Sequence, residues 1–179
     1  MNLDNYFDNN GITAKLNYLY QNINIYDNEI LFLKNKFVSP IAKLAPLFYK
    51  FYIIDTLSVE DFKCIRLFFE PLNKSDFLFR GYLYIMPDKN YAVRKIDMWI
   101  NRSINIDWIQ NVTITQDFEQ FEDKGWLLSK DETAIDFGVL RNSMDLLGER
   151  TISSSDYKIN EPIDDKIFQG PSKIVRIEP

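Results

Sequence analysis

Between residues 61 and 120 the chain carries four successive stretches in which apolar and polar side chains alternate. They read DFKCIRLFFEP, FLFRGYLYIMP, YAVRKIDMWIN and WIQNVTITQDFEQ, and turn residues such as PDKN at 87–90 separate them. Alternation with a period of two is typical of strands that bury one face and leave the other wetter. No helix-length crossover lies between the stretches, which favours an antiparallel meander. The four stretches therefore predict the core of an antiparallel sheet.

The same alternation assigns side chains to faces. On the second stretch one face is formed by Gly81, Leu83 and Ile85. The opposite face of that stretch is formed by Tyr82, Tyr84 and Met86. The pattern leaves open which of the two faces is concave.

The first 46 residues depart from this pattern. Asp27 is a plausible N-cap for a helix over 27–37, because Ile30, Leu33 and Phe37 recur near helical spacing. Ser39-Pro40 then starts a further helical turn with proline at its favoured first position. This segment supplies the only helical mass that could cover a sheet.

We therefore expect a single domain over residues 1–165, with a helical lead-in at 1–46, a sheet core at 47–140 and an extended exit at 166–179. The predicted fold is mainly β (α+β), a curved antiparallel sheet or half barrel of about six to eight strands. Short N-terminal helices would pack on or near its concave face.

The residue inventory excludes most enzyme classes. Histidine is absent from all 179 residues, and Cys64 is the single cysteine. The commonest general base and metal ligand are therefore missing, and neither a disulfide within the chain nor a thiolate zinc site can form. A net charge of −5, from 21 basic and 26 acidic residues, argues against a nucleic-acid surface. We expect a non-enzyme without cofactor, metal or nucleic-acid partner.

Carboxylates are the remaining candidates for chemistry. Asp55, Asp97 and Asp107 would have to meet in one cleft with divergent pKa values, and their spacing does not bring them together. Solvated residues at strand ends and turns are the more ordinary interpretation. Cys64 has no histidine to activate it as a nucleophile, which favours a small buried hydrophobic residue.

Aromatic residues form the candidate ligand-binding set. Its members are Tyr82, Tyr84, Trp99 and Trp108. On a curved sheet such side chains can line a surface that holds a lipid or another apolar ligand. The alternative is that they form cross-strand pairs and core packing, the usual role of aromatics in sheets, and the pattern favours this alternative.

The order of several phrases resembles a known family. NIYDNEILFLKNKFVSPIAKLAPLFYKFYIID, CIRLFFEPLNKSDFLFRGYLYI and the strand pair after them resemble the central segment of a bacterial outer-membrane family of unknown function. Its members typically combine a carboxypeptidase-regulatory-like β-domain, this segment and a C-terminal membrane barrel. The resemblance covers roughly residues 20–165. SDYKINEPIDDKIF resembles the stretch that leads toward the membrane part, and the strand layout is similar to lipoprotein-carrier half barrels.

The resemblance implies a periplasmic location within an outer-membrane protein. The implied partners are the membrane barrel or neighbouring domains of the parent chain, with lipid as a further candidate. The family has no established catalytic residues, so none is assigned here. Because the first residues are polar and acidic, without a signal peptide, we expect an excerpt of a longer exported chain.

Two hypotheses about function remain. In the first, the chain is a non-catalytic structural or interaction module whose lead-in fills the concave face. In the second, the concave face stays open and carries a lipid or other apolar ligand. A cavity of about 300 Å³ or more on that face would favour the carrier. Burial of Ile30, Leu33 and Phe37 there would favour the structural module.

Overall fold

The computed structural model describes residues 16–100, 104, 106, 109–121, 125–138, 146–159 and 162. A hairpin is formed by β1 (Glu29–Phe32) and β2 (Asn35–Val38). The large sheet consists of β3 (Tyr49–Val59), β4 (Phe62–Pro71), β5 (Phe79–Ile85), β6 (Val93–Ile100), β7 (Ile109–Phe121), β8 (Gly125–Phe137) and β9 (Leu146–Ser153). Two short 3₁₀ turns are η2 (Asn17–Tyr20) and η3 (Ala45–Leu47). No helix in the described ranges has the length and apolar character needed to cross a membrane.

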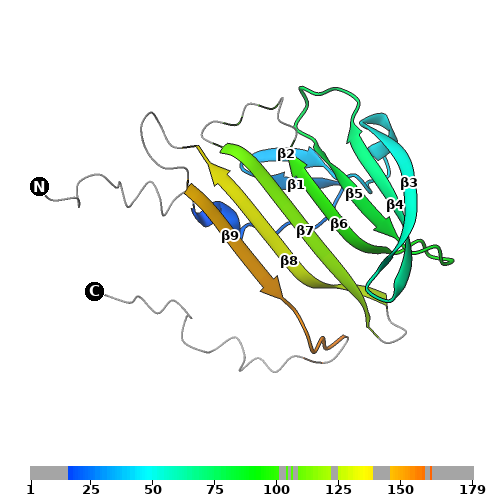
Figure 1. Ribbon diagram of the computed structural model, residues 1–179. Helices are drawn as coiled ribbons and strands as arrows, with labels where there is room; N and C mark the ends of the chain where they lie inside the picture. The colour runs from blue at the N-terminus through cyan, green and yellow to red at the C-terminus, as the bar shows by residue number, and fades with distance from the viewer. Residues whose placement is uncertain are drawn as a thin grey trace, which may run out of the picture.

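The large sheet is an antiparallel meander. Its seven strands lie in sequence order, and each pairs with the next, as Figure 1 shows. The sheet does not close, so β3 and β9 form its two edges. The prediction of a mainly β, antiparallel fold is therefore confirmed. β9 lies beyond residue 140, the expected end of the sheet core.

The predicted alternation also holds along the central strands. Leu83 on β5 pairs with Ile96 on β6, and both are buried. Tyr82 pairs with Asp97 in the adjacent row, on the opposite face. The pattern departs from expectation at the start of β7, where a register shift between Ile109 and Asn111 buries Ile109. A shift of this kind inserts a residue and reverses the facing of what precedes it.

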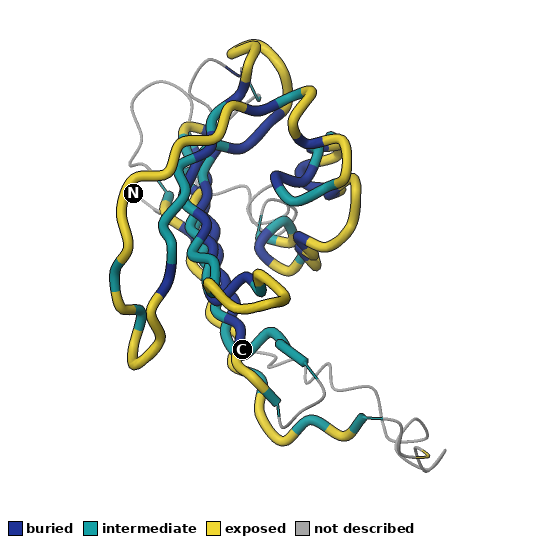
Figure 2. Tube along the Cα trace, turned by 90° about the vertical axis from the view of Figure 1, so that its right-hand side faces the viewer, coloured by how far each residue is buried: buried dark blue, intermediate teal, exposed yellow. Residues whose placement is uncertain are grey.

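One face of the sheet is covered by the segment that contains η2 and the β1–β2 hairpin. Figure 2 shows the sheet curving around this segment, which lies on its concave side. Burial of Ile30, Leu33 and Phe37 is as expected for a segment that fills this face. We call this the covered face, and we call the opposite side of the sheet the open face.

The predicted helix over 27–37 is wrong, because this stretch forms the β1–β2 hairpin. Ile30 pairs directly with Phe37 across it. Along β1 exposed and buried residues alternate, as a strand requires. The turn at Leu33 and Lys34 interrupts this alternation. As a result, the apolar residues of the two strands recur at a spacing that also matches a helix. The turn from Ser39 onward gives only η3, so the expected helical lead-in is largely a hairpin.

The hairpin turn has an unusual backbone. Leu33 and Lys34 adopt φ values of 52° and 64°. Two consecutive positive φ values characterise the tight hairpin turn that matches strand twist, which normally favours Asn and Gly. The N–H of Leu33 donates to Oε1 of Gln21 at 2.9 Å, and the Leu33 side chain is buried. Tertiary contacts thus hold a turn that local preference opposes.

Apolar packing joins the hairpin to the covered face. The ring of Phe37 stacks on Phe79 of β5 with centroids 4.5 Å apart, and both side chains are fully buried. Burying one such side chain stabilises a fold by roughly 1.5–3 kcal/mol. The hydroxyl of Tyr49 donates to the carbonyl of Val38 at 2.6 Å, which links β3 to the hairpin. Burial raises the pKa of Tyr49, which keeps this donor protonated.

A buried polar cluster fixes the stretch before the hairpin. Gln116 of β7 donates through Nε2 to the carbonyl of Ile23 at 2.7 Å and to Asp131 of β8 at 3.0 Å. Arg150 of β9 pairs with Asp131 and donates to the carbonyl of Gln21 at 3.3 Å. Gln116 and Arg150, both bound to Asp131 between them, thus donate to backbone carbonyls that would otherwise lack partners.

A second arginine closes one end of the covered face. Arg94 of β6 is 1% exposed, pairs with Glu60 in the β3–β4 turn and donates to the carbonyl of Phe118 at 2.6 Å. Beside it the rings of Phe62 and Trp126 meet edge to face at 5.7 Å. The tip of the β3–β4 hairpin is thereby connected to β7 and β8 across the concave side. The sheet is an open half barrel whose hollow is filled by its own chain.

Candidate functional site

Aromatic side chains form a row across four strands of the open face. Tyr52 on β3, Phe68 on β4 and Tyr82 on β5 lie opposite one another in register. Ring centroids are 6.3 Å apart for the first pair and 5.2 Å for the second. Trp99 on β6 continues the row at 5.9 Å from Tyr82. Such cross-strand aromatic contacts stabilise a sheet, and here they also create a broad partly exposed surface.

Two arginines lie against this row. Arg66 forms a bidentate pair with Asp55, with Nε–Oδ1 and Nη2–Oδ2 distances of 3.0 and 2.6 Å, and its guanidinium lies 5.4 Å from the centre of the Tyr82 ring. Arg80 lies between β4 and β6, 5.5 Å from the Phe68 ring and 5.9 Å from the Trp99 ring. Cations over aromatic faces are attracted by the ring quadrupole. The two arginines and the aromatic row define the aromatic half of the open face.

A line of titratable groups borders the aromatic half. Lys95 of β6 places Nζ at 3.5 Å from Asp97 and 3.8 Å from Asp117. Thr115 donates to Asp97 at 2.9 Å. Burial raises the pKa of Asp117, and the Lys95 ammonium opposes this only in part. Burial and the Asp97 carboxylate likewise raise the pKa of Tyr84. At neutral pH Tyr84 is therefore a neutral phenol, without the properties of a base.

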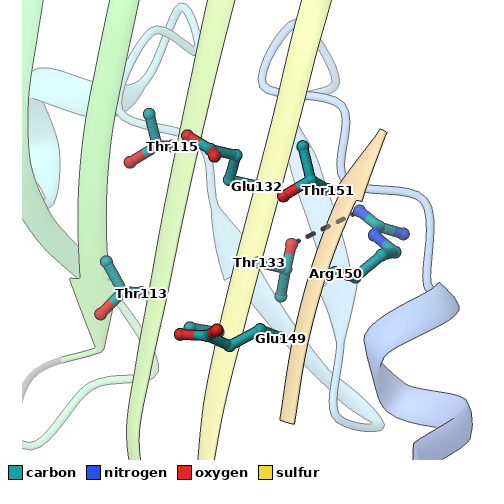
Figure 3. Close-up of a pocket in the computed structure, with 8 residues that line it drawn as sticks. Thr113, Thr115, Glu132, Thr133, Glu149, Arg150 and Thr151 are labelled. Atoms are coloured by element: carbon teal, nitrogen blue, oxygen red, sulfur yellow. Dashed lines mark hydrogen bonds between the residues drawn. The ribbon is translucent and has the colours of Figure 1, made fainter. Parts of the chain in front are cut away.

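The rest of the open face, over β7 to β9, is polar. A depression of about 250 Å³ is lined there by Thr113, Thr115, Glu132, Thr133, Ala134, Glu149, Arg150 and Thr151. Figure 3 shows these side chains spread over three strands, with no nucleophile and base in contact. The dashed hydrogen bond from Arg150 to Thr133, 3.4 Å long, belongs to the covered face, because both residues lie in the row of Ile114. We call this region the threonine half.

The structure brings three of the four predicted ligand-binding residues together. Tyr82, Tyr84 and Trp99 share the open face, on two neighbouring strands. This face is opposite the one that the N-terminal segment fills. Trp108 lies outside the described residues. Sequence reasoning missed Phe68 and Arg80, although their alternation with Phe69 and Gly81 would have placed them on this face.

The residues that the sequence analysis considered for catalysis do not form a catalytic arrangement in the part of the chain that the structure describes. Asp55 is paired with Arg66, Asp97 faces Lys95, and Asp107 is not described. Cys64 is buried, and burial raises the pKa of its thiol, so it is a poor thiolate. In the described ranges no group of three or more acidic or cysteine side chains could hold a metal ion.

Comparison with known proteins adds one finding. A family model described as "Family of unknown function (DUF5686)" matches residues 2–157. No curated protein matches the chain. No solved structure matches it either. Since the match extends over most of the sequence, the chain belongs to this family of unknown function.

Proposed function

We propose that this chain is a non-catalytic structural or interaction module of a larger outer-membrane-associated protein, located in the periplasm. One observation carries the proposal: the concave face, where a carrier would hold its ligand, contains the chain's own hairpin. Phe32 and Phe37 are fully buried there, and Phe37 stacks on the sheet residue Phe79. A segment packed and hydrogen-bonded in this way is part of the core, and its removal would expose that core to water.

The β3 edge supports an interaction role. Ile53 and Ile54 are 75% and 48% exposed, and Phe51 and Tyr52 beside them are also exposed. A long apolar edge strand is unusual because its unpaired backbone groups can add another strand. Strand addition at such an edge is a common mode of recognition between polypeptides. The proposed occupant is an extended segment from a neighbouring domain of the parent chain.

The resemblance to outer-membrane family members with a regulatory-like domain and a C-terminal barrel supports the cellular context. In such an arrangement a rigid half barrel would orient the parts on either side of it. Cell fractionation of the source bacterium with an antibody against this domain tests the location. We expect the signal in the envelope fraction, released with outer-membrane rather than soluble cytoplasmic proteins. A cytoplasmic signal would contradict the proposal.

Native mass spectrometry tests the role itself. Protein purified from a lipid-containing extract is expected to give the apo mass. A carrier that holds lipid on the predicted aromatic residues, which lie on the open face, predicts a co-purified lipid that is lost in Tyr84→Asp and Trp99→Asp variants whose circular dichroism remains that of a folded sheet. Tyr91→Asp is the matched control, because Tyr91 is exposed on the loop between β5 and β6. Lipid retained by the control and lost in both variants would overturn the structural proposal.

A further inference from the structure

Arg80 differs from the other arginines that the structure describes. Arg66, Arg94 and Arg150 each pair with a carboxylate, which belongs to Asp55, Glu60 and Asp131 respectively. Arg80, Arg94 and Arg150 each have a buried Nε without a partner, but within the described ranges Arg80 alone of the four has neither an ion pair nor a hydrogen bond. A guanidinium carries five donors and is always charged, so such a site has unused binding capacity.

Two aromatic rings contact the guanidinium of Arg80 without using its donors. Phe68 and Trp99 flank it at 5.5 and 5.9 Å from their ring centres. Aromatic faces attract the cation, but they accept no strong hydrogen bond. A guanidinium held in this way loses little conformational freedom when it binds a ligand, which lowers the cost of binding.

A depression opens beside this guanidinium. It has a volume of about 470 Å³ and is lined by Arg80, Trp99, Asn111 and Thr113. Asn111 and Thr113 lie on β7, where Thr113 pairs with Trp99 of β6. The depression thus combines one cation, one aromatic ring, one amide and one hydroxyl. Its volume lies within the range of small-molecule sites, about 300–1,000 Å³.

We propose that Arg80 and this depression form a binding site for a carboxylate-bearing small molecule. The planar fork of a guanidinium matches a carboxylate through two parallel hydrogen bonds. Asn111 and Thr113 can donate to the same or a neighbouring oxygen. A single positive charge on a chain of net charge −5 suits a monoanion better than a doubly charged phosphate. The flat face of Trp99 favours a ligand whose carboxylate is attached to a ring. This site is independent of the proposed structural role.

Glu70 is a carboxylate of the neighbouring strand β4 that could compete for Arg80. It follows Phe68 by two positions on β4, so it lies on the same face, just beyond the residues paired with β5. Its carboxylate instead accepts a hydrogen bond from the hydroxyl of Tyr52 at 3.3 Å, and no ion pair to Arg80 forms. Glu70 therefore repels an incoming anion without neutralising Arg80. Its removal should strengthen binding.

Titration followed by amide chemical shifts in NMR spectra tests this site. Benzoate, acetate and phosphate are compared at constant ionic strength, with sodium chloride as the blank. Benzoate is expected to give saturable shifts at Arg80, Trp99, Asn111 and Thr113, with a dissociation constant on the order of 1–10 mM. Acetate should bind more weakly because it lacks the ring, and phosphate should cause no saturable shift at these positions.

Four variants decide the origin of the shifts. Arg80→Gln should weaken benzoate binding by about tenfold or more, as expected for loss of a charge-assisted pair. Arg66→Gln is the matched control and should leave binding unchanged, because Arg66 is already paired with Asp55. Glu70→Gln should tighten binding severalfold. The amide spectrum of each variant shows whether it is folded, and Arg80→Lys provides a conservative replacement that keeps the charge but loses the fork.

The proposal is overturned if sodium chloride reproduces the shifts, or if a folded Arg80→Gln or Arg80→Lys variant binds benzoate as tightly as the parent. It is also overturned if phosphate binds in place of benzoate. Equal loss of binding in Arg66→Gln and Arg80→Gln would attribute the effect to general surface charge and would likewise contradict a site at Arg80.

Discussion

The same strands form both faces of this sheet, but the side chains on the two faces make different kinds of contact. On the covered face, apolar residues are fully buried, and the polar residues Gln116, Asp131 and Arg150 bind one another or backbone carbonyls. On the open face, Phe68, Tyr82 and Trp99 remain partly exposed. The first face is closed by its own chain, whereas the second retains groups that a partner or ligand could use.

Adjacent residues on one strand therefore carry different functions. Because side chains alternate across a pleated strand, Phe68 and Phe69 contribute to opposite faces. The covered face accounts for fold stability, and the open face can change with little effect on it. Each of the following substitutions tests this division, and they are ordered from the largest expected effect to the smallest.

The comparison is most directly tested on β4. Phe69→Ala removes a fully buried ring that contacts Tyr49, with 5.7 Å between ring centres. It should lower the free energy of unfolding by about 3–5 kcal/mol, because a cavity remains in the core. Phe68→Ala removes a partly exposed ring and should cost roughly 1 kcal/mol, in proportion to its smaller burial. Urea unfolding followed by tryptophan fluorescence measures both. Equal losses would show that the open face is also part of the core.

Two of the arginine–carboxylate pairs give a second comparison. Asp131→Ala leaves Arg150 buried without its carboxylate, which should lower the free energy of unfolding by about 3 kcal/mol. Asp55→Ala removes the partner of Arg66 on the open face and should have a much smaller effect, because water replaces the lost interaction. Thermal unfolding followed by circular dichroism compares them. A larger loss for Asp55→Ala would reverse the assignment of the two faces.

The turn of the hairpin allows a test in the stabilising direction. Lys34 has a positive φ that costs an L-residue roughly 1–2 kcal/mol, and glycine avoids this cost. After the greater flexibility of unfolded glycine is subtracted, Lys34→Gly should raise the free energy of unfolding by about 0.5–1 kcal/mol. Lys36→Gly in the adjacent strand β2 is the control and should destabilise. Denaturant midpoints that shift the same way for both would disprove the strain at Lys34.

The smallest effect concerns pH. Burial raises the pKa of Asp117 in the folded state above its unfolded value, although Lys95 and Arg94 lower it in part. The folded protein therefore binds this proton more tightly, and stability falls as pH rises through the interval between the two pKa values. Asp117→Asn removes that penalty, so the variant should be slightly more stable than the parent at pH 7. The gain should disappear below the unfolded pKa, which stability measurements at pH 3 and pH 7 can check.

The central sheet could be predicted from sequence because its signal is local. In FRGYLYI, alternation alone placed Leu83 on one face and Tyr82 on the other, and the pairing with β6 preserves this division. The same local logic failed for the hairpin. The apolar residues Ile30, Leu33 and Phe37 match a helix as well as two strands joined by a tight turn, and the turn residues Leu33 and Lys34 carry no hairpin signature.

The open-face site could be predicted only in part, since its key relations join distant segments. Tyr82 and Trp99 were identified as aromatic candidates, but the position of Arg80 between Phe68 and Trp99 depends on the register of three strands. Charge counting could not show that Arg80 lacks a carboxylate partner. The buried cluster of Gln116, Asp131 and Arg150 was equally hidden, because its partners are carbonyls near the start of the chain.

Those carbonyl contacts also affect the order in which parts of the protein can fold. Ile23 and Gln116 are 93 residues apart, and Gln21 and Arg150 are 129 residues apart. Contacts over such separations form slowly, because a long loop must close before they contribute. Phe37 of the hairpin can contact Phe79 of β5 early, but until β7 to β9 are in place the buried residues Leu19 and Ile23 are not enclosed. They are then open to aggregation or to capture by a chaperone. The stretch around η2 therefore reaches its final position only after the strands that follow it in the sequence.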